Sequence, residues 1–82
     1  MDVETLRRTV EELIESTAPI AQNNPIIRLD NKDFSKLLEV AKEKFSHNEV
    51  IQNMSSGEWK NEISAAALLQ KLSILKAELE QK

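Results

Sequence analysis

The sequence has no cysteine, no tyrosine, a single glycine (Gly57), two prolines and only three aromatic residues among its 82 residues. Without cysteine the chain can form neither a disulfide nor a thiolate metal site. A single glycine cannot build the glycine-rich loops that cradle phosphates. A hydrophobic fraction of 40% with 4% aromatics predicts a core made mainly of Leu, Ile, Val and Ala.

Long apolar runs are also missing. The longest spans residues 65–69, far short of the roughly 20 residues that a membrane-spanning helix needs. The chain opens with Asp2 and Glu4 instead of a basic stretch followed by an apolar one, unlike a signal peptide. The sequence therefore predicts a cytoplasmic protein with no membrane partner.

Positive charge is scarce and dispersed. Eleven basic against fourteen acidic residues give a net charge of −3, and no basic run exceeds two residues. Binding to phosphates would need a local basic patch, because the net negative charge of the protein repels them. We therefore predict no nucleic-acid partner. A DNA-binding regulator is the weakest alternative, supported only by Arg28, Lys32 and Lys36.

The sequence also contains few residues in patterns typical of catalytic or metal-binding sites. His47 is the only histidine, and Glu43 lies four residues before it, a spacing that could supply two metal ligands on one helical face. Two ligands do not make a site. The run Ser46–Glu49 is contiguous, and adjacent helical side chains point in different directions, so a helix cap explains it better than a catalytic group. We predict a protein that is not an enzyme, with no cofactor, metal or small-molecule substrate.

Apolar spacing and helix-start signals predict four helices. Apolar residues at a 3–4 spacing follow Val3, and Asp2 can cap this helix. Pro19 predicts an end or a kink near residue 18, with a kinked extension to about residue 22 as the alternative, because Ile20 and Ala21 continue the apolar stripe. Starts resembling capping boxes follow at Asp30, Ser46 and Ser55. The predicted helices span about 3–18, 31–45, 47–54 and 56–80. No alternating β-branched run argues for a sheet. The chain therefore reads as one all-α domain over residues 1–82, a small bundle of three main helices plus one short helix.

The predicted last helix carries two apolar stripes. One follows strict heptad-like spacing: Ala65, Leu68, Leu72, Leu75 and Leu79. The other lies nearly opposite: Trp59, Ile63, Ala66, Ala67, Ile74 and Ala77. At about 25 residues this helix would span roughly 37 Å against roughly 24 Å for the first. Its far end would then project beyond its neighbour and leave apolar surface of the kind that marks interfaces.

We therefore predict a protein–protein interaction domain that forms a homo-oligomer through the second stripe. An antiparallel or bundle arrangement is favoured over a parallel zipper, because Lys71 and Lys76 would bring like charges together in a parallel pair. The alternative is a monomeric adaptor or regulatory domain that docks a larger protein through Trp59, Ile63 and the loop at residues 25–27. A further alternative is that the second stripe packs against neighbouring helices inside the protein and forms part of its core.

Overall fold

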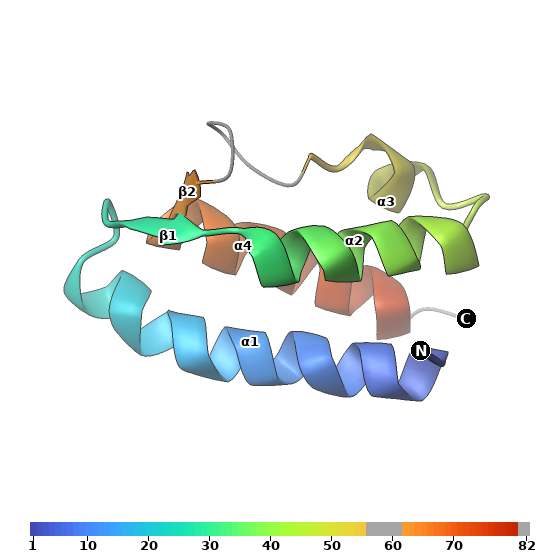
Figure 1. The fold of residues 1–82 in the computed structure, drawn as a ribbon, viewed down its shortest axis with the longest axis horizontal. Coiled ribbons are helices and arrows are strands. Elements are labelled where there is room, and N and C mark those ends of the chain that lie inside the picture. The colour runs from blue at the N-terminus through green and yellow to red at the C-terminus, as the bar shows by residue number, and fades with distance from the viewer. Residues whose placement is uncertain (56–61, 81–82) are drawn as a thin grey trace.

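The computed structural model describes residues 1–55 and 62–80 and is mostly helical. In this part of the chain the elements run α1 (Val3–Asn23), β1 (Arg28–Asp30), α2 (Lys32–Lys44), α3 (Glu49–Asn53), β2 (Glu62–Ser64) and α4 (Ala65–Glu80). Figure 1 shows α1, α2 and α4 as the three long elements, with α1 antiparallel to the other two and α3 at one end. The prediction of a mostly helical small domain is confirmed, whereas the expectation that no strand forms is wrong, so the all-α class fits only roughly.

Helix α1 is longer than predicted. Asp2 caps its start, since the side-chain Oδ1 accepts the Thr5 N–H at 2.7 Å. The helix then runs through Pro19 to Asn23 instead of ending near residue 18. A proline within a helix removes one backbone hydrogen bond. Ala21, two residues after Pro19, is buried, and this packing favours continuation of the helix past the proline.

The predicted helix over residues 56–80 is wrong at residues 62–64, and its first six residues lie outside the described residues. Residues 62–64 form β2, which pairs antiparallel with β1 in the register Arg28 with Ser64, Leu29 with Ile63 and Asp30 with Glu62. Helix α4 begins only at Ala65 and covers 16 residues. At 1.5 Å per residue α4 is about 24 Å long and the 21-residue α1 about 31 Å. The expected overhang of the last helix beyond the first is therefore reversed.

The remaining helix starts differ from the sequence signals by one or two residues. The N-cap residue of α2 is Asn31 and not Asp30. The Asp30 carboxylate nevertheless accepts the Lys32 N–H at 2.7 Å. Helix α3 is capped by Asn48, whose Oδ1 accepts the Ile51 N–H at 3.0 Å, and not by Ser46. The predicted start at Ser55 leads into residues 56–61, which lie outside the described residues.

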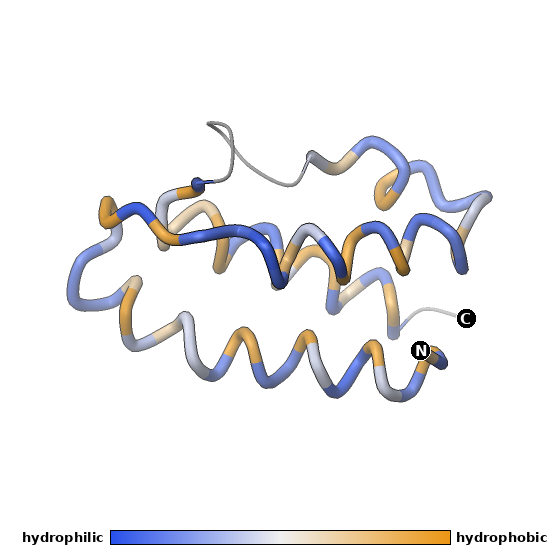
Figure 2. The backbone as a smooth tube through the Cα atoms, viewed as in Figure 1, coloured by the Kyte–Doolittle hydropathy of each residue, from blue (hydrophilic) through white to orange (hydrophobic). Residues whose placement is uncertain are grey.

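One core, made mainly of aliphatic side chains, joins the helices and β2. Figure 2 shows hydrophobic residues recurring along α1, as its spacing predicted. The core contains residues from every helix and one from β2: Leu6, Val10, Phe34, Leu37, Leu38, Ala41, Ile51, Ile63, Leu68, Leu72, Leu75 and Leu79. Helix α1 packs mainly against α4 and more loosely against α2. This difference leaves a groove between α1 and α2.

Candidate interaction surface

Helix α4 divides into a buried and an exposed face. The predicted leucine stripe is buried throughout: Ala65, Leu68, Leu72, Leu75 and Leu79. The opposite side holds six exposed residues, of which the last, Glu80, ends the helix. The five before it are what we call the outer face of α4: Ala66, Gln70, Ser73, Ile74 and Ala77. None of the five is charged. Ile74 is the largest apolar group among them and is 42% exposed.

The six residues of the predicted second stripe separate in the structure. Ala66, Ile74 and Ala77 lie on the outer face, and Ala67 is half-buried against the core. Trp59 lies outside the described residues. Ile63 is fully buried, so its assignment to an exposed stripe was wrong.

The strand pairing explains the position of Ile63. A strand alternates its side chains between two faces, whereas a helix repeats every 3.6 residues. Ile63 is the middle residue of β2 and pairs with Leu29 of β1, while its neighbours Glu62 and Ser64 are not buried. The helical wheel therefore placed Ile63 beside Ile74 only because the helix was extended too far toward the amino terminus.

Charged side chains of α4 lie along the two edges of the outer face and are engaged there. On one edge, Lys71 Nζ donates to Ser55 O at 2.9 Å and Ser55 Oγ at 2.8 Å, and Glu78 Oε1 accepts from Asn48 Nδ2 at 2.9 Å. On the other, Lys76 Nζ lies 4.0 Å from Glu80 Oε1. These contacts hold charge at the margins and leave the middle of the face neutral.

A shallow hollow adjoins the outer face where α4 begins beside the end of α1. Its volume is about 640 Å³. From α1 it is lined by Ala21 and Gln22, and from α4 by Ala66, Leu69, Gln70, Ser73 and Ile74. The sequence analysis missed the contribution of α1, because it favoured an end of that helix near residue 18 over the extension to about residue 22. The uncharged residues after Pro19 were the available signal.

The hollow belongs to an uncharged end of the molecule. Residues 16–27 and 63–70, twelve and eight residues, contain no Asp, Glu, Lys or Arg, although 30% of the chain is charged. Backbone hydrogen bonds join the two stretches: Ala65 N–H donates to Ile27 O at 2.9 Å and Ala66 N–H to Pro25 O at 3.0 Å. They satisfy helix-start donors that have no partner within the helix. Ile26, between these acceptors, is 81% exposed.

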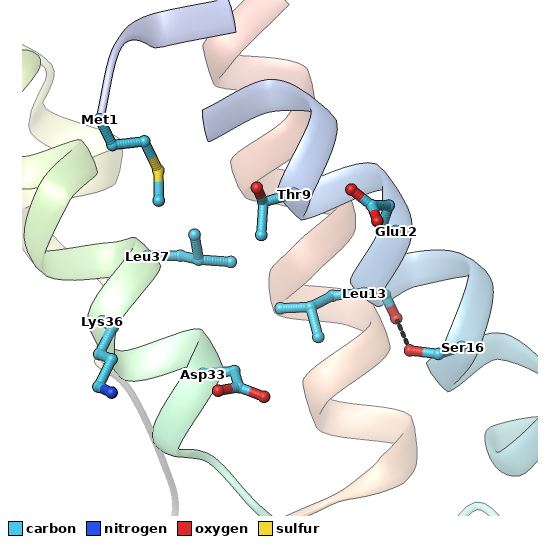
Figure 3. Close-up of a pocket in the computed structure, with 8 residues that line it drawn as sticks. All are labelled: Met1, Thr9, Glu12, Leu13, Ser16, Asp33, Lys36 and Leu37. Atoms are coloured by element: carbon cyan, nitrogen blue, oxygen red, sulfur yellow. Dashed lines mark hydrogen bonds between the residues drawn. The ribbon is translucent and has the colours of Figure 1, made fainter. Parts of the chain in front are cut away.

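The groove between α1 and α2 is a second hollow, of about 390 Å³ (Figure 3). Leu13 and Leu37 provide its apolar lining, and Met1 lies at one end. Glu12 and Lys36 stand among its polar lining residues. No sequence signal pointed to this groove, because it arises from the spacing of two helices and not from a local pattern.

The two residues at metal-ligand spacing in the sequence lie at the surface. His47 and Glu43 are both exposed. Across residues 1–55 and 62–80, no three His, Cys, Asp or Glu side chains gather in a way that could hold a metal ion. Hydrogen bonds from Thr5 to the Asp2 carboxylate lower the pKa of Asp2, as expected for a helix cap. The lowered pKa of Asp2 therefore results from the hydrogen bonds that cap the start of α1.

Arg28 and Lys32, two of the three basic residues behind the DNA-binding alternative, lie on β1 and at the first position of α2. The third, Lys36, lines the groove between α1 and α2 together with Asp33 and Glu12. Acidic side chains therefore accompany it.

Among the described helices, none is both long enough and apolar enough to cross a membrane.

No protein-family model matches the chain, and no curated protein or solved structure matches it significantly.

Proposed function

We propose that this protein is a small, non-enzymatic protein–protein interaction domain that self-associates through the outer face of α4. The observation that carries the proposal is the exposure of Ile74 within a helix face that has no charged residue. Exposed apolar surface rimmed by polar groups is typical of interaction sites. The absence of cysteine suits a reducing compartment, and a cytoplasmic location is part of the proposal.

The neutrality of this face favours a second copy as the partner. The protein carries a net charge of −3, so two copies repel each other weakly at long range. Contact through the outer face of α4 places no charged residue at the centre of the interface. Five exposed side chains are far fewer than the roughly 20 to 30 residues a side of a standard interface. We therefore expect weak, reversible association.

Light scattering at concentrations from about 10 µM to about 1 mM tests the proposal. The wild-type protein should shift from monomer to dimer or larger across this range. Ile74→Glu should stay a folded monomer, because a carboxylate would lose its hydration in the contact. Val50→Glu on α3 is the matched control, since Val50 is 45% exposed and lies outside the outer face. A wild-type protein that stays monomeric at about 1 mM would remove the proposal.

A monomeric adaptor that docks a larger protein is the second candidate. The 81% exposure of Ile26 favours it, because the flanking carbonyls of Pro25 and Ile27 hold this loop against the start of α4. A loop whose backbone is already held in place loses little conformational entropy when it binds a partner. This candidate expects a wild-type monomer at every concentration, so the same light-scattering series separates it from self-association.

A further inference from the structure

We infer that two copies of the chain pack the outer faces of α4 antiparallel, about a two-fold axis that passes between the two helices at the height midway between Lys71 and Leu72. This inference rests on the proposed self-association and specifies its geometry. A two-fold interface brings the same patch of each copy together, so residue i meets residue j and residue j meets residue i. The outer face of α4 has a sequence that fits such a pairing.

The pairing follows from positions along the helix. In an antiparallel pair centred between residues 71 and 72, residues at the same height have numbers that add up to 143. Ala66 then lies level with Ala77 of the second copy, and Gln70 lies level with Ser73 of the second copy. All four residues are exposed. Apolar residues therefore face apolar residues, and the two polar residues face each other.

The small side chains determine how closely the helices can approach. Ala66 and Ala77 lie eleven residues apart, about three turns, and so on the same side of α4. Because alanine is small, two contacts between Ala66 and Ala77 allow the helix axes to come close at both ends of the interface. Between them, the Gln70 side-chain amide can donate to the Ser73 hydroxyl of the second copy, and the reverse.

Ile74 fits beside this central line. Ile74 and Ala67 lie seven residues apart, two helical turns, and therefore share one edge of the outer face. In the antiparallel pair, Ile74 of the second copy sits at the height of Leu69, between the heights of Ala67 and Gln70. The larger side chain thus meets a small one, and the two Ile74 residues are offset by five positions, about 7.5 Å.

Other alignments fit less well. A parallel pair places each residue at the height of its own counterpart, so Ile74 would lie level with Ile74 and Gln70 with Gln70. It would also align the two helix dipoles in the same direction. An antiparallel pair shifted so that Ala66 meets Ser73 would leave Ala77 without a partner, because α4 of the second copy begins at Ala65 and has no residue at that height. The register centred between residues 71 and 72 avoids both mismatches.

Engineered cysteines test this register directly, because the natural chain contains no cysteine. In the inferred pair, Cα atoms at positions 66 and 77 of opposite copies come within the 4.4 to 6.8 Å that a disulfide tolerates. Two copies of position 66 would lie at least eleven residues, about 16 Å, apart along the axis. An equimolar mixture of Ala66→Cys and Ala77→Cys, one carrying a tag that changes its mass, is oxidised and separated on a non-reducing gel.

The mixed disulfide should exceed either homodisulfide by at least about tenfold, and Ile74→Glu in both proteins should abolish it. A predominant homodisulfide of Ala66→Cys would overturn the register in favour of a parallel pair. Dimers seen by light scattering without the mixed disulfide would also overturn the register, while leaving self-association intact. A monomeric wild-type protein would overturn both. Circular dichroism of each variant verifies that the fold is kept.

A charge-pairing experiment provides a second measurement that needs no oxidation. Gln70→Lys and Ser73→Glu should each weaken self-association by about tenfold, because each puts like charges near the two-fold axis. Mixing the two variants should restore association as a heterodimer, since position 70 of one copy faces position 73 of the other. Equal association in the mixture and in the separate variants would contradict the register.

Discussion

The pair Ile63→Ala and Ile74→Ala tests the placement of β2 and the outer face of α4 together. Both residues belong to one stripe if the last helix starts at residue 56. In the structure Ile63 is fully buried in β2, whereas Ile74 is 42% exposed on α4. Substitution by alanine should therefore lower the free energy of unfolding by different amounts at the two positions.

The expected magnitudes follow from burial. Isoleucine to alanine removes three carbon atoms, worth about 2.4 kcal/mol at roughly 0.8 kcal/mol for each buried group. At Ile63 a cavity term adds to this loss, and the total free energy of unfolding should fall by about 3 kcal/mol. At Ile74 the partly exposed side chain loses about 1.4 kcal/mol of burial. The higher helix propensity of alanine returns up to about 0.5 kcal/mol, leaving a loss of about 1 kcal/mol.

Urea denaturation followed by circular dichroism measures both losses. The experiment uses about 1 µM protein, so that dissociation does not contribute to the unfolding free energy. A slope near 1 kcal/mol/M, usual for a small domain, would give Ile63→Ala a midpoint lower by about 3 M and Ile74→Ala one lower by about 1 M. Equal losses at the two positions would refute the strand pairing and return Ile63 to the exposed stripe.

Two further predictions concern helix caps. Asn48→Ala should lower the free energy of unfolding by about 1 kcal/mol, because it removes the cap of α3 and the hydrogen bond to Glu78. Ser46→Ala should change the free energy of unfolding by less than about 0.5 kcal/mol. Thermal denaturation measures both, and a larger loss for Ser46→Ala than for Asn48→Ala would contradict the observed cap. Because the pKa of Asp2 is lower in the folded than in the unfolded protein, its contribution to stability is complete above about pH 4 and is lost as the pH falls through the lower, folded-state pKa. Asp2→Asn, which keeps the cap, should lack this acid-dependent loss, so identical stability–pH curves for the two proteins would refute it.

The sequence predicts the helices wherever local periodicity and packing agree. The leucine stripe of α4 is buried as expected, and Asp2 caps α1 as expected. The end of α1 could not be predicted from Pro19 alone, because the burial of Ala21 depends on where α4 lies. Tertiary contacts routinely override such local signals.

The strands could not be predicted for a similar reason. Each has three residues, too few to display an alternating pattern, and their pairing joins positions about 34 residues apart in the sequence. The candidate site was predicted in part: the wheel placed Ala66, Ile74 and Ala77 together, but it also included Ile63. The hollow beside Ala21 needed the relative positions of two helices.

Helices α1 and α4 differ in the side that each turns away from the core. Every helix of a three-helix arrangement keeps one side away from the core, so an exposed side alone carries no meaning. On α1 that side is charged, with Glu4, Arg8, Glu11 and Glu15 all exposed. On α4 the corresponding side carries Ala, Gln, Ser and Ile, although the helix has four charged residues that lie at its edges or its end. Since both helices could meet water equally well with charged side chains, the requirements of this fold do not account for the uncharged face of α4, and this difference supports the proposed contact with a second copy.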